Sequence, residues 1–233
     1  MSRRARRRIA LAVVLIVVVL GAAFAVVFLG GDAPPPPSLS DDEAAATSEP
    51  AATATATPDA AASSSSWTVS AGAETFVGYR VREEFASIGV KDAVGRTPDV
   101  SGSVDVEGDT ITAAKLDAEV FTLVSDETRR DNALRERGIE SARFPTASFE
   151  LTEPVELSRS KTTAAGELTL HGQTRPIEVT LRSQRIGDST IELAGSAPIA
   201  FADYDIEPPS IAGFVTVEDE GALEFKIRLR PVA

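Results

Sequence analysis

Apolar and polar residues alternate along most of the chain after residue 76, with the period of two that is typical of β-strands. Segments with this alternation occur at residues 77–81, 100–106, 111–121, 146–151, 163–170, 177–181, 191–201 and 223–229. Each segment has one apolar face, so the pattern predicts an all-β domain with an antiparallel sheet. Because closure removes the exposed edges of a sheet, we expect an eight-stranded antiparallel barrel.

Short turns join neighbouring strands into hairpins. Residues 107–109 (Glu-Gly-Asp) connect the second strand to the third, and residues 171–174 (His-Gly-Gln-Thr) connect the fifth to the sixth. The apolar phase of the third strand slips between Ala113 and Leu116, which predicts a β-bulge. An eight-stranded barrel has an interior just wide enough for side chains or for one slender ligand.

One short helix is predicted between the third and fourth strands. Ser125 is suited to the N-cap position, because the acidic residues Asp126 and Glu127 follow it in the first turn. Good helix-forming residues follow, and Gly138 predicts the end of the helix. A single helix between strands predicts a crossover that covers one opening of the barrel.

The N-terminal part of the chain has the pattern of a membrane anchor. Residues 9–30 are 22 residues without a charge, which as a helix would extend roughly 33 Å and span a bilayer. The basic residues 1–8 would remain cytoplasmic, so a single-pass protein of the cell membrane with an extracytoplasmic C-terminal domain is expected. The alternative is a secreted protein whose signal peptide is cleaved at residues 23–25 (Ala-Phe-Ala).

Residues 31–66 have the composition of a linker. They are rich in proline, alanine, threonine and serine, with six acidic groups and no basic one. Such a segment buries too little apolar area to offset the entropy of ordering, so we expect a disordered spacer. The composition changes at Trp67, and residues 67–233 are long enough to form one domain with a sizeable core.

Composition limits the chemistry that the chain can perform. The absence of cysteine excludes disulfides, thiol nucleophiles and thiolate zinc sites, and the single histidine, His171, excludes multi-histidine metal sites. Five arginines lie within residues 1–8, which leaves 18 basic residues against 35 acidic ones in the rest of the chain. Such an excess of negative charge repels phosphate backbones, so nucleic-acid binding is disfavoured.

Two sequence motifs resemble the signature of the YceI-like family of exported proteins. The first is RRDNALRERGIESARFPTASFEL, and the second is AAGELTLHGQTRPIEVTL. The residues that match are Arg130, Asp131, Leu134, Phe144, Pro145 and Phe149 in the first motif, and Gly166, Leu168, Leu170, His171, Gly172 and Thr174 in the second. The resemblance extends from Trp67 to about Val232.

The resemblance implies an extended lipocalin-like barrel with a long apolar cavity that binds an isoprenoid lipid or an isoprenoid quinone, without catalysis. The sequence departs from the family in two places. Family members often carry a histidine after the first long strand, where this chain has Arg82, Glu83 and Glu84. The usual Arg-x-x-aromatic-Gly segment near the C-terminus is replaced by residues 201–206.

Candidate site residues follow from the strand phases and from the resemblance. The expected cavity-lining residues are Tyr79, Val81, Phe121, Leu134, Phe149, Leu168 and Phe201. The candidate polar contacts to a ligand are Arg130, Asp131 and His171. Each also has a structural interpretation: apolar residues of strands form the core, His171 belongs to a tight turn, and the charged pair pins the helix to the barrel. We expect no catalytic residue and no metal ligand.

The sequence therefore predicts a membrane-anchored extracytoplasmic protein that stores, transports or shields an isoprenoid lipid or quinone. No other cofactor is expected. One alternative is a ligand-free module for contacts at the cell surface, which would have bulky residues filling the barrel. A second alternative, an enzyme acting through acidic residues, is disfavoured because no activated nucleophile is evident.

Overall fold

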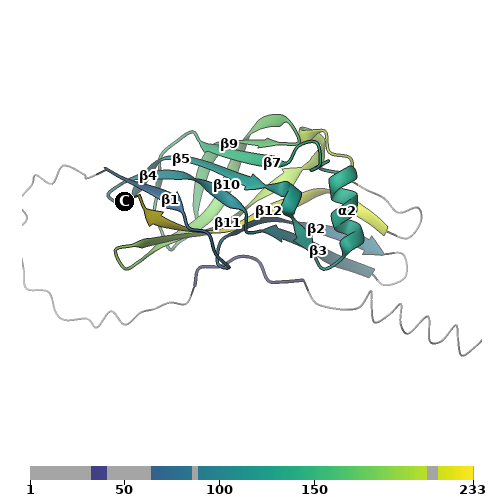
Figure 1. Cartoon of the computed structure of the whole chain (residues 1–233), viewed down its shortest axis with the longest axis horizontal. Coiled ribbons are helices and arrows are strands. Elements are labelled where there is room, and N and C mark those ends of the chain that lie inside the picture. Colours follow the sequence, from purple (N-terminus) through teal and green to yellow (C-terminus); the bar gives the residue numbers. More distant parts are fainter. Residues whose placement is uncertain (1–32, 41–63, 86–88, 209–214, 233) are drawn as a thin grey trace, which may run out of the picture. The chain divides into compact units, whose positions relative to one another are not determined.

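The computed structural model describes residues 33–40, 64–85, 89–208 and 215–232 of the 233-residue chain (Figure 1). The basic residues 1–8 and the predicted membrane anchor at residues 9–30 lie outside the described residues. Within the described ranges, no helix combines the length and the apolar character that crossing a membrane requires. The membrane anchor therefore stays a prediction from the sequence.

Eight strands form a closed antiparallel ring, because β12 pairs with β11 on one side and with β1 on the other. In ring order the strands are β1 (Ser64–Val69), β4 (Val100–Glu107), β5 (Thr110–Glu119), β7 (Thr146–Leu151), β9 (Thr162–Leu170), β10 (Gln173–Ile186), β11 (Thr190–Ala200) and β12 (Val215–Pro231). The predicted eight-stranded antiparallel barrel is confirmed.

The sheet continues beyond the ring at one end of the barrel. Strand β12 pairs with β1 only near its C-terminal end, and its earlier part pairs with β2 (Phe76–Phe85). Strand β3 (Gly89–Thr97) pairs with β2, and the short β6 (Val124–Ser125) pairs with β3. Figure 1 shows β2 and β3 at the same end of the barrel as the helix α2. A further two-residue strand, β8 (Val155–Glu156), pairs with β5.

The predicted helix is present as α2 (Thr128–Glu136), but its N-cap is Glu127 and not Ser125. The Glu127 side chain accepts a hydrogen bond from the backbone N–H of Arg129, which is the interaction expected of a capping residue. Ser125 lies two residues earlier because it pairs with Gly95 as part of β6. The helix ends at Glu136, with Arg137 as its C-cap, and the next residue, Gly138, has a positive φ of 65° that fits the predicted stop.

The hairpin between β9 and β10 is tighter than predicted. Leu170 pairs with Gln173, so the turn contains only His171 and Gly172, with φ angles of 51° and 74°. Two successive positive φ angles are the conformation of a type I′ turn, which suits the twist of a hairpin. Gln173 and Thr174, which were expected in the turn, are therefore the first residues of β10.

The predicted bulge lies slightly earlier in β5 than expected. Asp105 of β4 faces Ala113, whereas the next residue, Val106, faces Ile111, so Thr112 is the extra residue. The shift changes which face of β5 points inward, and Ile111 and Ala114 are both buried as a result.

The end of β11 also differs from the prediction. The strand ends at Ala200, and Phe201 begins a 3-10 helix, η2 (Phe201–Tyr204). The residue after it, Asp205, has a left-handed conformation with φ of 53°. Phe201 is therefore a helical residue and not a strand residue.

The boundary of the folded domain lies earlier than Trp67. Ser64, Ser65 and Ser66 pair with β4 as the first half of β1, because backbone hydrogen bonds do not require apolar side chains. The Ser66 hydroxyl also donates to Asp105 Oδ1 at 2.7 Å. The sequence assigned these residues to the linker, since serine is typical of spacers. Trp67 itself is buried between the strands, with 4% of its surface exposed.

A second part of the expected linker, residues 35–40, belongs to the same compact unit as the barrel. The Ser40 backbone N–H and hydroxyl donate to the carboxylate of Glu192 at 2.5 and 2.9 Å. Gln184, Lys226 and Arg228 donate to Ser40 oxygens at 2.9–3.0 Å. Glu192 is completely buried, so its negative charge needs the two hydrogen bonds that Ser40 donates to it. We call residues 35–40 the docked segment; the predicted disorder does not hold for it.

Candidate functional site

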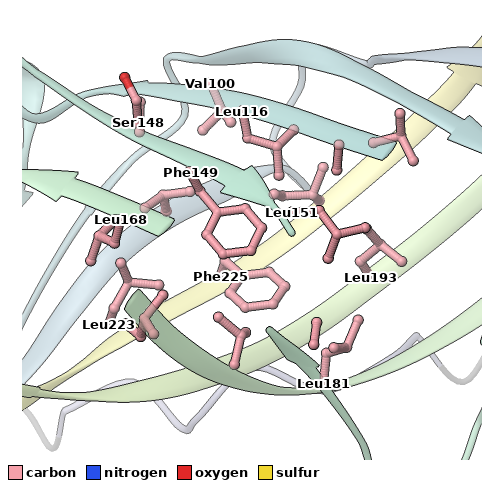
Figure 2. A pocket seen from close by; sticks show the side chains of 18 of the residues that line it. Val100, Leu116, Ser148, Phe149, Leu151, Leu168, Leu181, Leu193, Leu223 and Phe225 are labelled. Atoms are coloured by element: carbon pink, nitrogen blue, oxygen red, sulfur yellow. The ribbon is translucent and has the colours of Figure 1, made fainter. Parts of the chain in front are cut away.

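The ring strands enclose an apolar space that we call the ring chamber (Figure 2). Its wall includes Val104, Leu116, Phe149, Leu193, Phe225 and Ile227, which come from five strands. The centres of water molecules can occupy about 100 Å³ of it, against roughly 10–15 Å³ for a single water. The ring chamber is therefore a cavity and not a packing defect.

The apolar character of the ring chamber follows from the strand alternation. Among the described residues that line it, only Asp117 and Ser148 are polar. The Ser148 hydroxyl donates to Asp117 Oδ1 at 2.6 Å, and Figure 2 shows it pointing away from the chamber. No polar group of these two residues is therefore left to bind a ligand inside.

Phe149 extends over Gly166 of the neighbouring strand β9. A Cβ atom at Gly166 would lie 2.4 Å from two carbons of the Phe149 ring. The glycine thus permits the ring to lie flat against the barrel wall. This explains why both residues belong to the sequence motifs, because a side chain at Gly166 would drive the ring into the chamber.

A second cavity, which we call the helix chamber, lies beside α2. It is lined by β2, by the first half of β12 and by η2, and Leu134 and Arg130 of α2 form part of its wall. Its volume on the same measure is about 120 Å³. The two chambers share Val77, Ala147 and Leu223 as wall residues, so these three side chains form the partition between them.

The helix chamber has a charged wall that the ring chamber lacks. Arg130 Nε and Nη2 donate to the two carboxylate oxygens of Glu83 at 2.9 and 2.8 Å, and Nη1 donates to Asp126 Oδ1 at 2.5 Å. Burial alone would lower the pKa of Arg130, but the hydrogen bonds from its guanidinium to Glu83 outweigh this effect and raise it. The guanidinium is therefore permanently charged and held in place by two carboxylates.

Asp131 supports the helix from within. Its carboxylate accepts hydrogen bonds from the backbone N–H and the hydroxyl of Ser125, at 3.0 and 2.7 Å. Asp131 is 7% exposed and is not among the residues that line either chamber. The adjacent residues Arg130 and Asp131 therefore do not pair with each other; they attach α2 to β2 and to β6, respectively.

Tyr79 extends into the helix chamber from β2. It faces Gly95 of β3, and a Cβ atom there would lie 2.4 Å from the tyrosine ring. Among the described residues, the buried Tyr79 hydroxyl has no hydrogen-bond partner. Burial raises the pKa of Tyr79, and the nearby Arg130 offsets only part of this effect, so the hydroxyl keeps its proton at neutral pH.

The structure divides the predicted cavity residues between the two chambers. Phe149 and Leu168 line the ring chamber, and Tyr79, Val81, Leu134, Phe201 and Arg130 line the helix chamber.

Phe121, which was expected to line the cavity, does not. It lies in the 3-10 helix η1 (Val120–Thr122), 46% of its surface is exposed, and its ring lies 5.6 Å from the Arg135 guanidinium. The turn of η1 buries Val120 and directs Phe121 outward.

His171 has the structural role that was the alternative to ligand contact. Its Nδ1 lies 2.8 Å from the backbone oxygen of Tyr204, and its Nε2 lies 2.8 Å from the carboxylate of Glu140. The ring of Phe144 packs edge-on against it, with centroids 4.7 Å apart. The two sequence motifs therefore meet at this point, where His171 joins the β9–β10 turn to the segment after α2.

Sequence reasoning missed Glu83 as a wall residue. It continues the row of inward-facing positions Val77, Tyr79 and Val81, and only 7% of its surface is exposed. The signal was present, because an acidic residue on the apolar phase of a strand implies a buried partner. That partner, Arg130, lies 47 positions away in the chain and could not be paired with it without the fold.

A closed antiparallel barrel with an apolar interior and a helix beside one end defines a class of small β-barrel proteins with internal cavities. The model of the YceI-like domain matches residues 67–229, and the chain belongs to this family. A UPF0312 protein of Vibrio cholerae is 26% identical over 155 residues, which cover 63% of this chain and 80% of that protein. A UPF0312 protein of Shewanella is 26% identical over 144 residues, covering 58% and 73%.

Solved structures share the fold at low sequence identity. A polyisoprenoid binding domain from Saccharophagus degradans has a TM-score of 0.55 at 18% identity, over 71% of this chain and 98% of that domain. BcnA of Burkholderia cenocepacia has a TM-score of 0.52 at 15% identity, over 71% and 95%. These similarities establish the fold of the barrel.

Proposed function

We propose that this protein binds an isoprenoid lipid or an isoprenoid quinone inside the barrel and stores, carries or shields it without turnover. The protein performs this role on the extracytoplasmic side of the cell membrane, attached through residues 9–30. The observation that carries the proposal is the ring chamber, a cavity enclosed by strands whose inward-facing side chains are apolar.

The driving force for binding is the transfer of an apolar tail out of water. At about 25 cal/mol per Å² of apolar surface, a tail of several prenyl units gains several kcal/mol before the entropy of association is subtracted. A flexible linear tail suits a narrow cavity lined by aliphatic and aromatic side chains. The Saccharophagus degradans domain, described as polyisoprenoid binding, has the same fold and supports this ligand class.

The proposal is tested by lipid extraction and mass spectrometry of the full chain, purified from its native host. Two alanines of β5 provide a matched pair of variants: Ala114 lines the ring chamber, and its neighbour Ala113 is exposed outside the barrel. Ala114→Leu fills part of the cavity, whereas Ala113→Leu adds the same atoms to the surface. We expect a prenyl lipid in stoichiometric amount with the wild type and Ala113→Leu, and a large decrease with Ala114→Leu.

The paired design separates a cavity ligand from lipid that accompanies the membrane segment, because the latter is the same in both variants. Equal lipid content in the two variants, or no prenyl lipid in any of them together with no uptake of added prenyl lipid, would contradict the proposal. The second result would favour a ligand-free module for protein contacts. Thermal unfolding of each variant establishes that the fold is retained.

A further inference from the structure

The two chambers differ in polarity, and this difference determines the orientation of a bound lipid. The ring chamber offers no polar group among its described inward-facing residues, whereas the helix chamber contains the Tyr79 hydroxyl and the Arg130–Glu83 pair. An amphiphile therefore places its tail in the ring chamber and its polar head beside α2, with the partition between them. This inference rests on the proposed function and concerns the chemistry of the head group.

We propose that the helix chamber is a head-group site for a prenyl lipid with an uncharged oxygen acceptor, such as a quinone carbonyl or an alcohol, and that Tyr79 donates the hydrogen bond. The buried Tyr79 hydroxyl has no partner among the described residues, which is costly for a polar group. The neighbouring Ser125 hydroxyl lies close to Tyr79 but is saturated: it donates to Asp131 Oδ1 at 2.7 Å, and its oxygen accepts from the backbone N–H of Glu127 at 3.2 Å and from Arg130 Nη1 at 3.3 Å. A ligand oxygen would satisfy the hydroxyl.

The charges around the site favour a neutral head group. Arg130 is the cation closest to Tyr79 in the chamber wall, and its charge is already compensated by Glu83 and Asp126. Arg80, the other cation of this wall, is bound to Glu224 at 2.6 Å and to Asp92 at 3.1 Å. A phosphate or diphosphate would compete with these carboxylates and be repelled by them. The site therefore discriminates against phosphorylated prenyl lipids.

Gly95 positions the donor. The Tyr79 ring lies against the backbone of β3, and a Cβ atom at Gly95 would come within 2.9 Å of the tyrosine oxygen and closer still to the ring. Gly95→Ala therefore displaces the hydroxyl without removing it. This gives a second variant that tests the placement of the hydroxyl.

The experiment compares four probes that differ only in the head group: a hydrocarbon of four prenyl units, the corresponding alcohol, the corresponding diphosphate, and a naphthoquinone carrying the same tail. Their affinities for the full chain are measured by displacement of a fluorescent apolar probe. The variants are Tyr79→Phe, Gly95→Ala and, as a matched control, Tyr204→Phe. Tyr204 is the second tyrosine of the chain and does not line either chamber.

The wild type is expected to bind the alcohol and the quinone at least tenfold more tightly than the diphosphate. Tyr79→Phe weakens binding of the alcohol and the quinone about tenfold, which is the usual size of one hydrogen bond, and leaves the hydrocarbon unchanged. Gly95→Ala produces the same selective loss, and Tyr204→Phe produces none. The apo form of Tyr79→Phe unfolds at the same temperature as the wild type or higher, because an unpaired hydroxyl has been removed.

Three results would overturn the inference. The first is tighter binding of the diphosphate than of the quinone. The second is an equal effect of Tyr79→Phe on the hydrocarbon and on the oxygenated probes. In both of these cases, binding of the hydrocarbon tail would persist, and the proposed function would stand while the head-group site fails. The third result, no binding of any probe, would remove both.

Discussion

Glu192 illustrates, at the scale of a single residue, how a buried charge is stabilised in this barrel. Burial alone would raise its pKa, but hydrogen bonds from Ser40 and Arg228, together with the charge of Lys226, lower it on balance. A lowered pKa in the folded state means that the ionised carboxylate stabilises the fold above the pKa of the unfolded chain. This contribution is lost as the pH falls through the lowered folded-state value.

Glu192→Gln is therefore expected to lower the free energy of unfolding by about 1–3 kcal/mol at pH 7, because two cations lose their buried partner. The difference from the wild type should shrink as the pH falls from the unfolded-state pKa towards the lowered folded-state pKa, below which the wild-type carboxyl is also neutral. Urea denaturation of both proteins at a series of pH values measures this difference in the free energy of unfolding.

Glu150→Gln is the matched control, since Glu150 is exposed and pairs with Lys115 at 2.9 Å on the surface. We expect it to change stability by less than about 1 kcal/mol. An equal effect of the two substitutions would contradict the role assigned to Glu192.

Individual site residues were predictable from the sequence only where the strand pattern was regular. Tyr79 and Val81 follow the inward phase of β2, and both line the helix chamber. Phe121 was assigned wrongly because the chain leaves the strand after Glu119, and the 3-10 helix that follows buries Val120. A change from strand to helix alters which residue faces inward, and strand alternation cannot signal it.

At the scale of elements, α2 is attached to the barrel mainly by charged residues. Most of its side chains are polar or charged, and Asp131 is its one buried residue. The bidentate contact from Arg130 to Glu83 connects it to β2. The helix therefore depends on ion pairs whose removal leaves a partner uncompensated.

Arg130→Met is expected to lower the free energy of unfolding by about 3 kcal/mol, because Glu83 remains buried without its cation. Backbone amides of α2 should also exchange hydrogen faster, which hydrogen-exchange mass spectrometry measures. Arg129→Met, at the exposed neighbouring position of the same helix, should leave both quantities nearly unchanged. Similar effects of the two substitutions would show that the contact to Glu83 does not hold the helix.

The eight predicted strands correspond to seven strands of the ring and to β2, and this much followed from alternation. The prediction missed β3, whose sequence Gly89–Thr97 carries Lys91, Asp92 and two glycines among few apolar residues. It also missed β1 (Ser64–Val69) altogether, and the first half of this strand, Ser64–Ser66, is held by backbone pairing. Elements fixed by their neighbours in the sheet leave no pattern in their own sequence.

At the scale of the whole molecule, the partition between the chambers should limit the length of the bound tail. Ala147 is the smallest of the three side chains that both chambers share. If the proposed lipid extends from the helix chamber into the ring chamber, its tail passes this point. A larger residue at Ala147 would close the passage.

Ala147→Leu is therefore expected to weaken binding of a naphthoquinone with four prenyl units at least tenfold, while a quinone with two units keeps most of its affinity. Displacement of a fluorescent apolar probe from the full chain measures both. Ala165→Leu, on a neighbouring strand and outside both chamber walls, should affect neither ligand. Equal losses for short and long tails would argue against a passage at Ala147.

The docked segment changes how far the barrel could travel from a membrane. A free spacer of residues 31–66 would reach roughly 120 Å at about 3.4 Å per residue. Because the docked segment, residues 35–40, is bound to the barrel, only residues 31–34 would remain as a free tether, and their full extension is about 14 Å. Under the proposed anchoring at residues 9–30, so short a tether would favour direct exchange of a lipid between the barrel and the membrane.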